Sequence, residues 1–123
     1  MNPKVWIVCG AVLGGIAVAA GALGAHSLEG RLDAAKLRSF ETAARYQMFH
    51  ALALVLCGLL ASIRPSTLVH AAAAAFLIGT LAFSGGLYAW IFTGQRALVH
   101  VVPVGGLVWI VAWLLLALAA WRS

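Results

Sequence analysis

Four long apolar runs occupy most of the chain, and they constrain its fold more than any other feature. They cover approximately residues 5–24, 46–63, 68–92 and 98–121. A helix needs roughly 20 mainly apolar residues to cross the hydrocarbon core of a bilayer. Hydrophobic residues make up 64% of the chain and charged residues only 9%, whereas soluble domains carry about 25% charged residues. The sequence therefore predicts an all-α integral membrane four-helix bundle that forms a single domain, residues 1–123.

The formal net charge of +5 comes from Lys and Arg side chains at the ends of the apolar runs. Such scattered cations reach the lipid headgroups by snorkelling, and they do not form the basic face that nucleic-acid binding requires. We therefore expect the lipid bilayer, and not nucleic acid, to be a partner. Cys9 and Cys57 lie inside apolar runs without a CxxC spacing, and we interpret both as small apolar residues.

Small residues recur at steps of three and four in the first and third runs. They are Gly10, Gly14, Ala17, Gly21 and Gly24 in the first run, and Ala75, Gly79, Ala82 and Gly86 in the third. Stripes of this kind let two membrane helices approach closely, within one protomer or between protomers, so we expect a homo-oligomer. The first run also resembles a signal peptide, but it is long for one, and we interpret it as a span.

The only substantial polar segment, residues 26–45, connects the first two runs. Gly30 is expected to form a turn, and Asp33 is expected to cap a helix. The apolar positions after Asp33 predict a short interfacial helix of about 33–45 that leads into the second span. Pro65 is expected to end that span, because proline cannot continue a helical hydrogen-bond ladder.

Four spans place both termini on one side of the membrane, which we call side B. Side A then contains the loop after the first span and the turn near residues 93–100. The Lys and Arg residues on side A are Arg31, Lys36, Arg38, Arg45 and Arg96, and those on side B are Lys4, Arg64 and Arg122. By the positive-inside rule, this predicts that side A is cytoplasmic and that the N- and C-termini are not.

Most polar groups that could support chemistry fall in the leaflet on side A. The candidate polar or ligand site consists of His26, Glu41, Arg45, Tyr46, Gln47, His50, Ser84 and Tyr88. Polar groups at membrane depth must find partners, and three readings stay open. The residues pack and anchor the helices, or bind a small molecule, lipid or quinone, or hold a metal or haem. No HxxxH or HxH spacing places two ligands together, so no metal or cofactor is predicted.

Several stretches together resemble a known family of small membrane proteins, typified by bacterial YgdD and YwdK. The resemblance rests on "GALGAHSL" (21–28), "FETAARYQMFHALAL" (40–54), "FSGGLY" (83–88) and "PVGG" (103–106), followed by Trp113. Gly86 stands where the family commonly has Ser, and Val102 where Thr is common. The resemblance implies a four-span inner-membrane protein, but the family is catalogued as a domain of unknown function and supplies no catalytic residue. The matching polar positions are His26, Arg45, Tyr46, Gln47, His50, Ser84 and Tyr88.

No catalytic constellation is visible in the sequence. There is no Ser-His-Asp set, phosphate-binding loop or pair of carboxylates. We therefore expect a non-enzymatic accessory or scaffold protein, which assembles with itself or with a membrane-protein partner. The alternative is a binding module for a lipid, quinone, metal or haem at the polar cluster. A small transporter is the third reading, although four short helices enclose little volume.

Overall fold

The computed structural model describes all residues, 1–123, and contains four long helices. They are α1 (Lys4–Leu23), α2 (Ala34–Ile63), α3 (Thr67–Thr93) and α4 (Val101–Arg122). A π-helical turn, Gly24–Leu28, follows α1, and a 3-10 turn, Arg96–His100, precedes α4. All four helical segments are long and apolar enough to cross a membrane. The predicted all-α architecture with four long apolar helices is confirmed.

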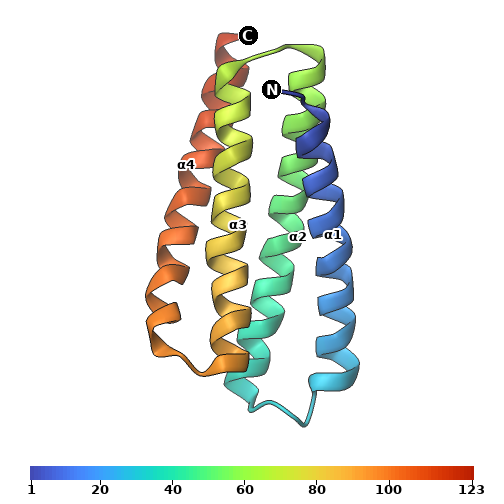
Figure 1. Cartoon of the computed structure of the whole chain (residues 1–123), viewed down its shortest axis with the longest axis vertical. Coiled ribbons are helices and arrows are strands. Elements are labelled where there is room, and N and C mark those ends of the chain that lie inside the picture. The colour runs from blue at the N-terminus through green and yellow to red at the C-terminus, as the bar shows by residue number, and fades with distance from the viewer.

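The helices run antiparallel, and α2 and α3 form the centre of the bundle. Figure 1 shows α1 and α4 at opposite edges, with α1 beside α2 and α4 beside α3. Both termini and the turn at residues 64–66 lie at one end of the bundle, side B, and the other two connections lie at side A. Most buried residues belong to α2 and α3. The core includes Leu54 and Cys57 of α2, Phe76 of α3 and Trp109 of α4.

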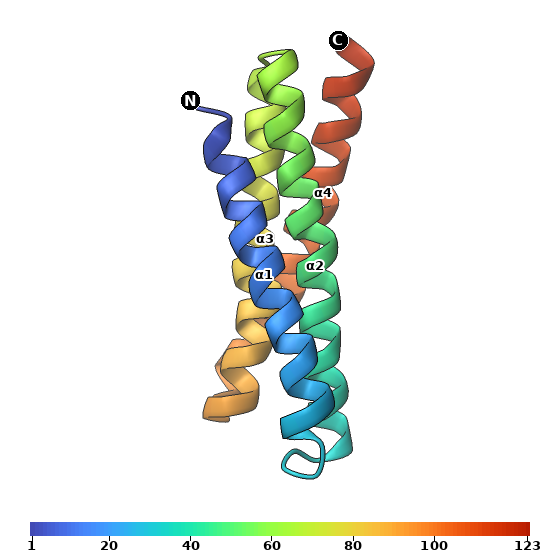
Figure 2. The same cartoon turned by 90° about the vertical axis from the view of Figure 1, so that its right-hand side faces the viewer.

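The prediction of a separate interfacial helix between the first two spans is wrong. Residues 34–63 form one continuous helix of 30 residues, about 45 Å long, and its side A end extends past the end of α3 (Figure 2). No glycine or proline interrupts the sequence between Ala34 and Cys57. Phe40 is buried against Tyr88 and Phe92 of α3. One face of the polar first half is therefore covered by the neighbouring helices, and the helix continues straight into the span.

The helix ends follow from local sequence. The Asp33 carboxylate accepts a hydrogen bond from the Lys36 backbone N–H at 2.8 Å, which confirms the predicted cap. α2 ends at Ile63, two residues before Pro65, as expected. Gly30 and Gly94 have positive φ values of 86° and 70°. Glycine adopts this conformation without a steric penalty, so the chain can reverse at both side A connections.

The small residues of α1 fall on two different surfaces. Gly10 lies so close to α2 that a Cβ atom there would come within 2.6 Å of the Ala51 carbonyl oxygen. Ala17 and Gly24 are also buried. Gly14 has room for a Cβ, whose nearest neighbours would be 3.8 Å away or more, and Gly21 has no neighbour within 4 Å. The close approach of α1 and α2 thus depends on part of the stripe, with Gly10 as its tightest point.

The small residues of α3 lie mainly toward α4. A Cβ atom at Gly79 would come within 2.4 Å of the Trp109 ring, and one at Gly86 within 3.1 Å of Val102. Ala75 packs beside the core. Ala82 faces Gly105 of α4, where a Cβ would come within 2.5 Å of the Phe83 backbone nitrogen. Glycines on both helices therefore bring α3 and α4 together.

Candidate functional site

His50 lies at the meeting point of α2 and α4 and uses both of its ring nitrogens. Its Nδ1 lies 2.7 Å from the Tyr46 carbonyl oxygen, one helical turn earlier. The Trp113 indole N–H donates to His50 Nε2 at 3.2 Å. A carbonyl oxygen only accepts and an indole N–H only donates. The bonds therefore define a neutral ring with its proton on Nδ1.

Aromatic stacking fixes the His50 ring further. The ring lies parallel to Trp109, with centroids 3.7 Å apart and an interplanar angle of 3°. Trp113 meets it edge-on at 5.9 Å. A metal ion on Nε2 would have to displace Trp113, and a metal on Nδ1 would have to displace the backbone bond. Nowhere in the chain do three His, Cys, Asp or Glu side chains gather in a way that could hold a metal ion.

Gln47 connects three helices from the interior of the bundle. Its side-chain N–H donates to the Leu13 carbonyl oxygen of α1 at 2.8 Å. Its side-chain oxygen accepts a hydrogen bond from the Tyr88 hydroxyl of α3 at 2.9 Å. The side chain is only 2% exposed. Buried amides are stable at membrane depth only when their polar atoms are paired, and here both ends of the amide join α2 to a neighbour.

Two further buried hydroxyls complete the polar interior. Ser84 of α3 donates to the Ala43 carbonyl oxygen of α2 at 2.8 Å. Thr80 donates to the Phe76 carbonyl oxygen at 2.8 Å and accepts from the Trp109 indole N–H at 3.3 Å. No buried side-chain nitrogen or oxygen in the chain lacks a hydrogen-bond partner. The buried polar groups therefore act as cross-links between helices.

The predicted cluster divides into buried and exposed members. The structure brings Gln47, Ser84 and Tyr88 together at the junction of α2 and α3, and places His50 toward α4. The other members, in contrast, are exposed: His26, Glu41, Arg45 and Tyr46. Of these, Glu41 and Arg45 line a shallow surface hollow between α1 and α2. The eight residues consequently do not surround one common site.

The sequence did not identify the residues that pair with the buried polar groups. Thr80, Trp109 and Trp113 were not among the candidates, although all three bond or stack with the buried polar groups. A signal was present, because Trp109 and Trp113 lie one turn apart within an apolar run and each indole N–H needs an acceptor. The Leu13 carbonyl could not be foreseen, because any backbone oxygen on α1 would have been an equal candidate.

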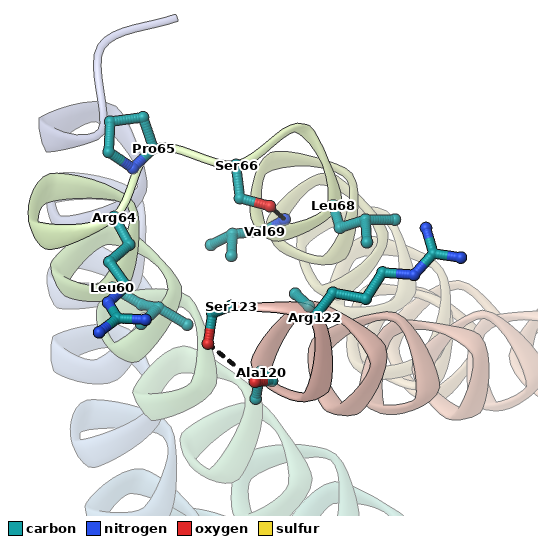
Figure 3. Close-up of a pocket in the computed structure, with 10 residues that line it drawn as sticks. Leu60, Arg64, Pro65, Ser66, Leu68, Val69, Ala120, Arg122 and Ser123 are labelled. Atoms are coloured by element: carbon teal, nitrogen blue, oxygen red, sulfur yellow. Dashed lines mark hydrogen bonds between the residues drawn. The ribbon is translucent and has the colours of Figure 1, made fainter.

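A separate hollow of about 350 Å³ lies at side B, between the α2–α3 turn and the end of α4. Figure 3 shows Arg64 and Arg122 on either side of it, with their guanidinium groups pointing away from one another. The Ser66 hydroxyl is already used, since it caps α3 by accepting from the Val69 backbone N–H. Nearby, the Trp6 indole N–H donates to His70 at 2.8 Å. This end thus carries helix-joining contacts and no converging set of free polar groups.

Comparison with known proteins gives a consistent result. Residues 20–106 match a family described as "Protein of unknown function (DUF423)". The chain is 40% identical over 116 residues to the UPF0382 membrane protein SERP0230 of Staphylococcus epidermidis, an alignment that covers 94% of each chain. It is 36% identical over 119 residues to the UPF0382 membrane protein YwdK of Bacillus subtilis, covering 95% of this chain and 96% of YwdK. The chain belongs to this family.

A UPF0382 membrane protein of Haemophilus influenzae is 37% identical over 113 residues, covering 92% of this chain and 90% of the relative. No solved structure matches the chain. The resemblance drawn from the sequence motifs is confirmed. Together with the four apolar helices, the family identifies a small bacterial multi-pass membrane protein of unknown function.

Proposed function

We propose that this protein is a non-enzymatic accessory or scaffold protein of the bacterial inner membrane. The observation that carries the proposal is that every buried polar side chain is already bonded within the chain. Catalytic and binding sites need donors or acceptors that are free to meet a substrate or a developing charge. In this bundle the buried donors and acceptors hold α1, α3 and α4 against α2.

The shape of the interior supports the same proposal. Large side chains fill the centre, including Leu54 and Phe76, which are fully buried. Gln47 lies across the space between α1, α2 and α3. A transporter needs a polar path or a broken helix at the bilayer midplane, and α2 and α3 are continuous through it. The transporter reading therefore has no observation in its favour.

The reading as a metal, haem or quinone module at the predicted cluster also lacks support. Both His50 nitrogens are engaged. His26 lies on the surface at the side A end of α1, and Glu41 and Arg45 face the hollow between α1 and α2. His50 therefore does not share a site with Glu41 and Arg45, and the cluster does not converge on one ligand.

The outer face of α1 is the surface best suited to assembly. Its exposed small residues are Ala11, Gly15, Ala19 and Ala22, at steps of four, four and three. A Cβ added at Gly15 would meet nothing within 4 Å. Small residues at this spacing allow the backbone of a second helix to approach closely. We therefore assign this face to self-association or to a membrane-protein partner.

The orientation remains as the charge distribution predicts. Both side A connections lie at the same end of the bundle (Figure 1), so the five Lys and Arg residues of side A lie toward that end. The positive-inside rule then favours a cytoplasmic side A and non-cytoplasmic termini.

The test is native mass spectrometry of protein released in a mild detergent, with an absorption spectrum of the same sample. We expect a defined oligomer or a stoichiometric protein partner, and no chromophore. Gly15→Leu should dissociate the assembly, while Gly85→Leu, which adds the same bulk at a site that also has open space on α3, should not. A monomer in both detergent and membranes without any partner, or equal loss with both variants, would refute the proposal.

A further inference from the structure

A continuous groove follows the outer side of the bundle between α2 and α4, with α3 at its base. It consists of three adjoining hollows. The first two share Thr42 and Phe83, and the second and third share Tyr46, His50 and Trp113. We call this surface the α2–α4 groove. The α1–α2 hollow that contains Glu41 and Arg45 adjoins it, and Phe49 borders both.

The groove changes from polar to apolar along its length. Its side A end is lined by Arg38, Ser39 and Thr42, all in the first third of α2. Its far end is lined by Leu52 and Leu56. The rise per residue of an α-helix gives about 21 Å between Thr42 and Leu56. That exceeds the ~15 Å thickness of one leaflet's hydrocarbon, so the apolar part can accommodate an acyl chain.

The polar end offers hydrogen-bond donors that the chain itself does not use. Ser62, Thr80 and Thr93 each donate to the carbonyl oxygen four residues earlier, as helical hydroxyls commonly do. Ser39 and Thr42 make no such bond, and the Arg38 guanidinium has no partner within the chain. Three adjacent donor groups therefore face the groove unpaired.

The charge of this end is uniformly positive. The chain has only three acidic residues. Asp33 caps the N-terminus of α2, Glu29 lies in the preceding loop, and Glu41 lies one turn after Arg38 but lines the hollow between α1 and α2. No carboxylate lines the groove beside Arg38. An arginine with two hydroxyls is a donor set suited to a phosphate group.

The middle of the groove owes its width to a glycine. A Cβ at Gly106 of α4 would meet only the Phe83 ring, at 3.8 Å, so the space above it is open. Tyr46 and Trp113 form the walls here and are 42% and 44% exposed. Their large apolar ring surfaces are suited to contact with an acyl chain. The hollow at this point has a volume of about 430 Å³.

We propose that the α2–α4 groove binds one glycerophospholipid from the side A leaflet. Its phosphate is held by Arg38, Ser39 and Thr42, and one acyl chain lies along the aromatic walls toward Leu56. This goes beyond the proposed scaffold role and does not depend on it. A quinone fits less well, because its neutral ring carries no negative charge to pair with the unpaired arginine at the level of the headgroups.

The test measures retained lipid by native mass spectrometry after delipidation and titration with palmitoyl-oleoyl phosphatidylglycerol. We expect one tightly retained molecule per chain. Arg38→Gln should weaken binding roughly tenfold, as expected for loss of a charge-assisted contact. Arg64→Gln is the matched control, since it removes the same charge from the side B end of α2, far from the groove, and should leave binding unchanged. Diacylglycerol with the same acyl chains lacks the phosphate. Its binding to the unchanged protein should be as weak as, or weaker than, the binding of phosphatidylglycerol to Arg38→Gln.

A steric variant tests the groove independently of charge. Gly106→Leu should fill the hollow and abolish retention, while Gly85→Leu should retain the lipid. If circular dichroism shows that Gly106→Leu is misfolded, the double variant Ser39→Ala/Thr42→Val replaces it, because it removes two donors without adding bulk. Equal losses for Arg38→Gln and Arg64→Gln, a quinone that displaces the phospholipid, or full retention by a folded Gly106→Leu would overturn the proposal.

Discussion

The contact between α1 and α2 at Gly10 gives the sharpest prediction about what holds the bundle together. A Cβ atom at this position would lie 2.6 Å from the Ala51 carbonyl oxygen, 2.7 Å from a Val55 methyl group and 2.9 Å from the Val55 nitrogen. The first distance is about 0.8 Å inside the 3.4 Å at which ordinary van der Waals contact begins. Two of the three atoms belong to the backbone, so the strain cannot be relieved by a side-chain rotation. Gly10→Ala must therefore move the helices apart.

The expected cost follows from that displacement. A gap of 0.5–1 Å forfeits about a quarter to a half of the dispersion energy at each affected contact, and overpacking of a well-packed site typically costs about 1–3 kcal/mol. Alanine gains up to about 1 kcal/mol over glycine from helix propensity, which offsets part of this loss. We expect Gly10→Ala to lower the free energy of unfolding by about 1–2 kcal/mol.

Unfolding in mixed micelles with increasing dodecyl sulfate, followed by far-ultraviolet circular dichroism, measures this quantity. Gly15→Ala is the control in the same helix, because its Cβ would meet nothing within 4 Å, and it should be neutral or slightly stabilising. Val55→Ala should rescue Gly10→Ala only in part, since the clash with the Ala51 oxygen remains. Equal stability of the Gly10 and Gly15 variants would refute the close-packing argument.

Three further predictions concern the polar interior and the topology. Gln47→Leu should lower stability by about 1–3 kcal/mol, because it removes the bonds to Leu13 and Tyr88 and leaves the half-buried Tyr88 hydroxyl unpaired. Ser84→Ala should cost only about 0.6 kcal/mol, the average for a hydrogen bond between membrane helices, since Ala43 keeps its own helical backbone bond. Both are measured by the same titration, and a stable Gln47→Leu variant would show that the cross-link contributes little. A reporter fused to the C-terminus should be active outside the cytoplasm; cytoplasmic activity would reverse the assigned orientation.

The helices themselves were largely predictable because the bilayer imposes a simple requirement on sequence. A run of about 20 apolar residues has few alternatives to a spanning helix, and the signals at Gly30, Asp33 and Pro65 mark where helices start or stop. The join at residues 45–46 was misjudged for a related reason. The charged residues indicate a change of environment, but a change from polar to apolar composition does not interrupt a helical backbone without glycine or proline.

The candidate site was less predictable because it depends on which faces of the helices meet. The sequence showed that Gln47, His50 and Ser84 needed partners at membrane depth. It could not show that the partners are three backbone carbonyls, a tyrosine and a tryptophan. Helical rotation and crossing decide this, and small-residue stripes constrain them only locally, as Gly10 against α2 and the unoccupied surroundings of Gly21 illustrate.

The central claim is that the buried polar groups join helices and do not hold a ligand, and the protonation pattern of His50 tests it most directly. Nitrogen-15 spectra of histidine-labelled protein in bilayers, with His50 identified by its loss in His50→Gln, report which ring nitrogen carries the proton. We predict a single neutral form with the proton on Nδ1, and an Nε2 signal that shifts when Trp113→Phe removes its donor. A proton on Nε2, a mixture of both forms, or an Nε2 signal unaffected by Trp113→Phe would contradict the account.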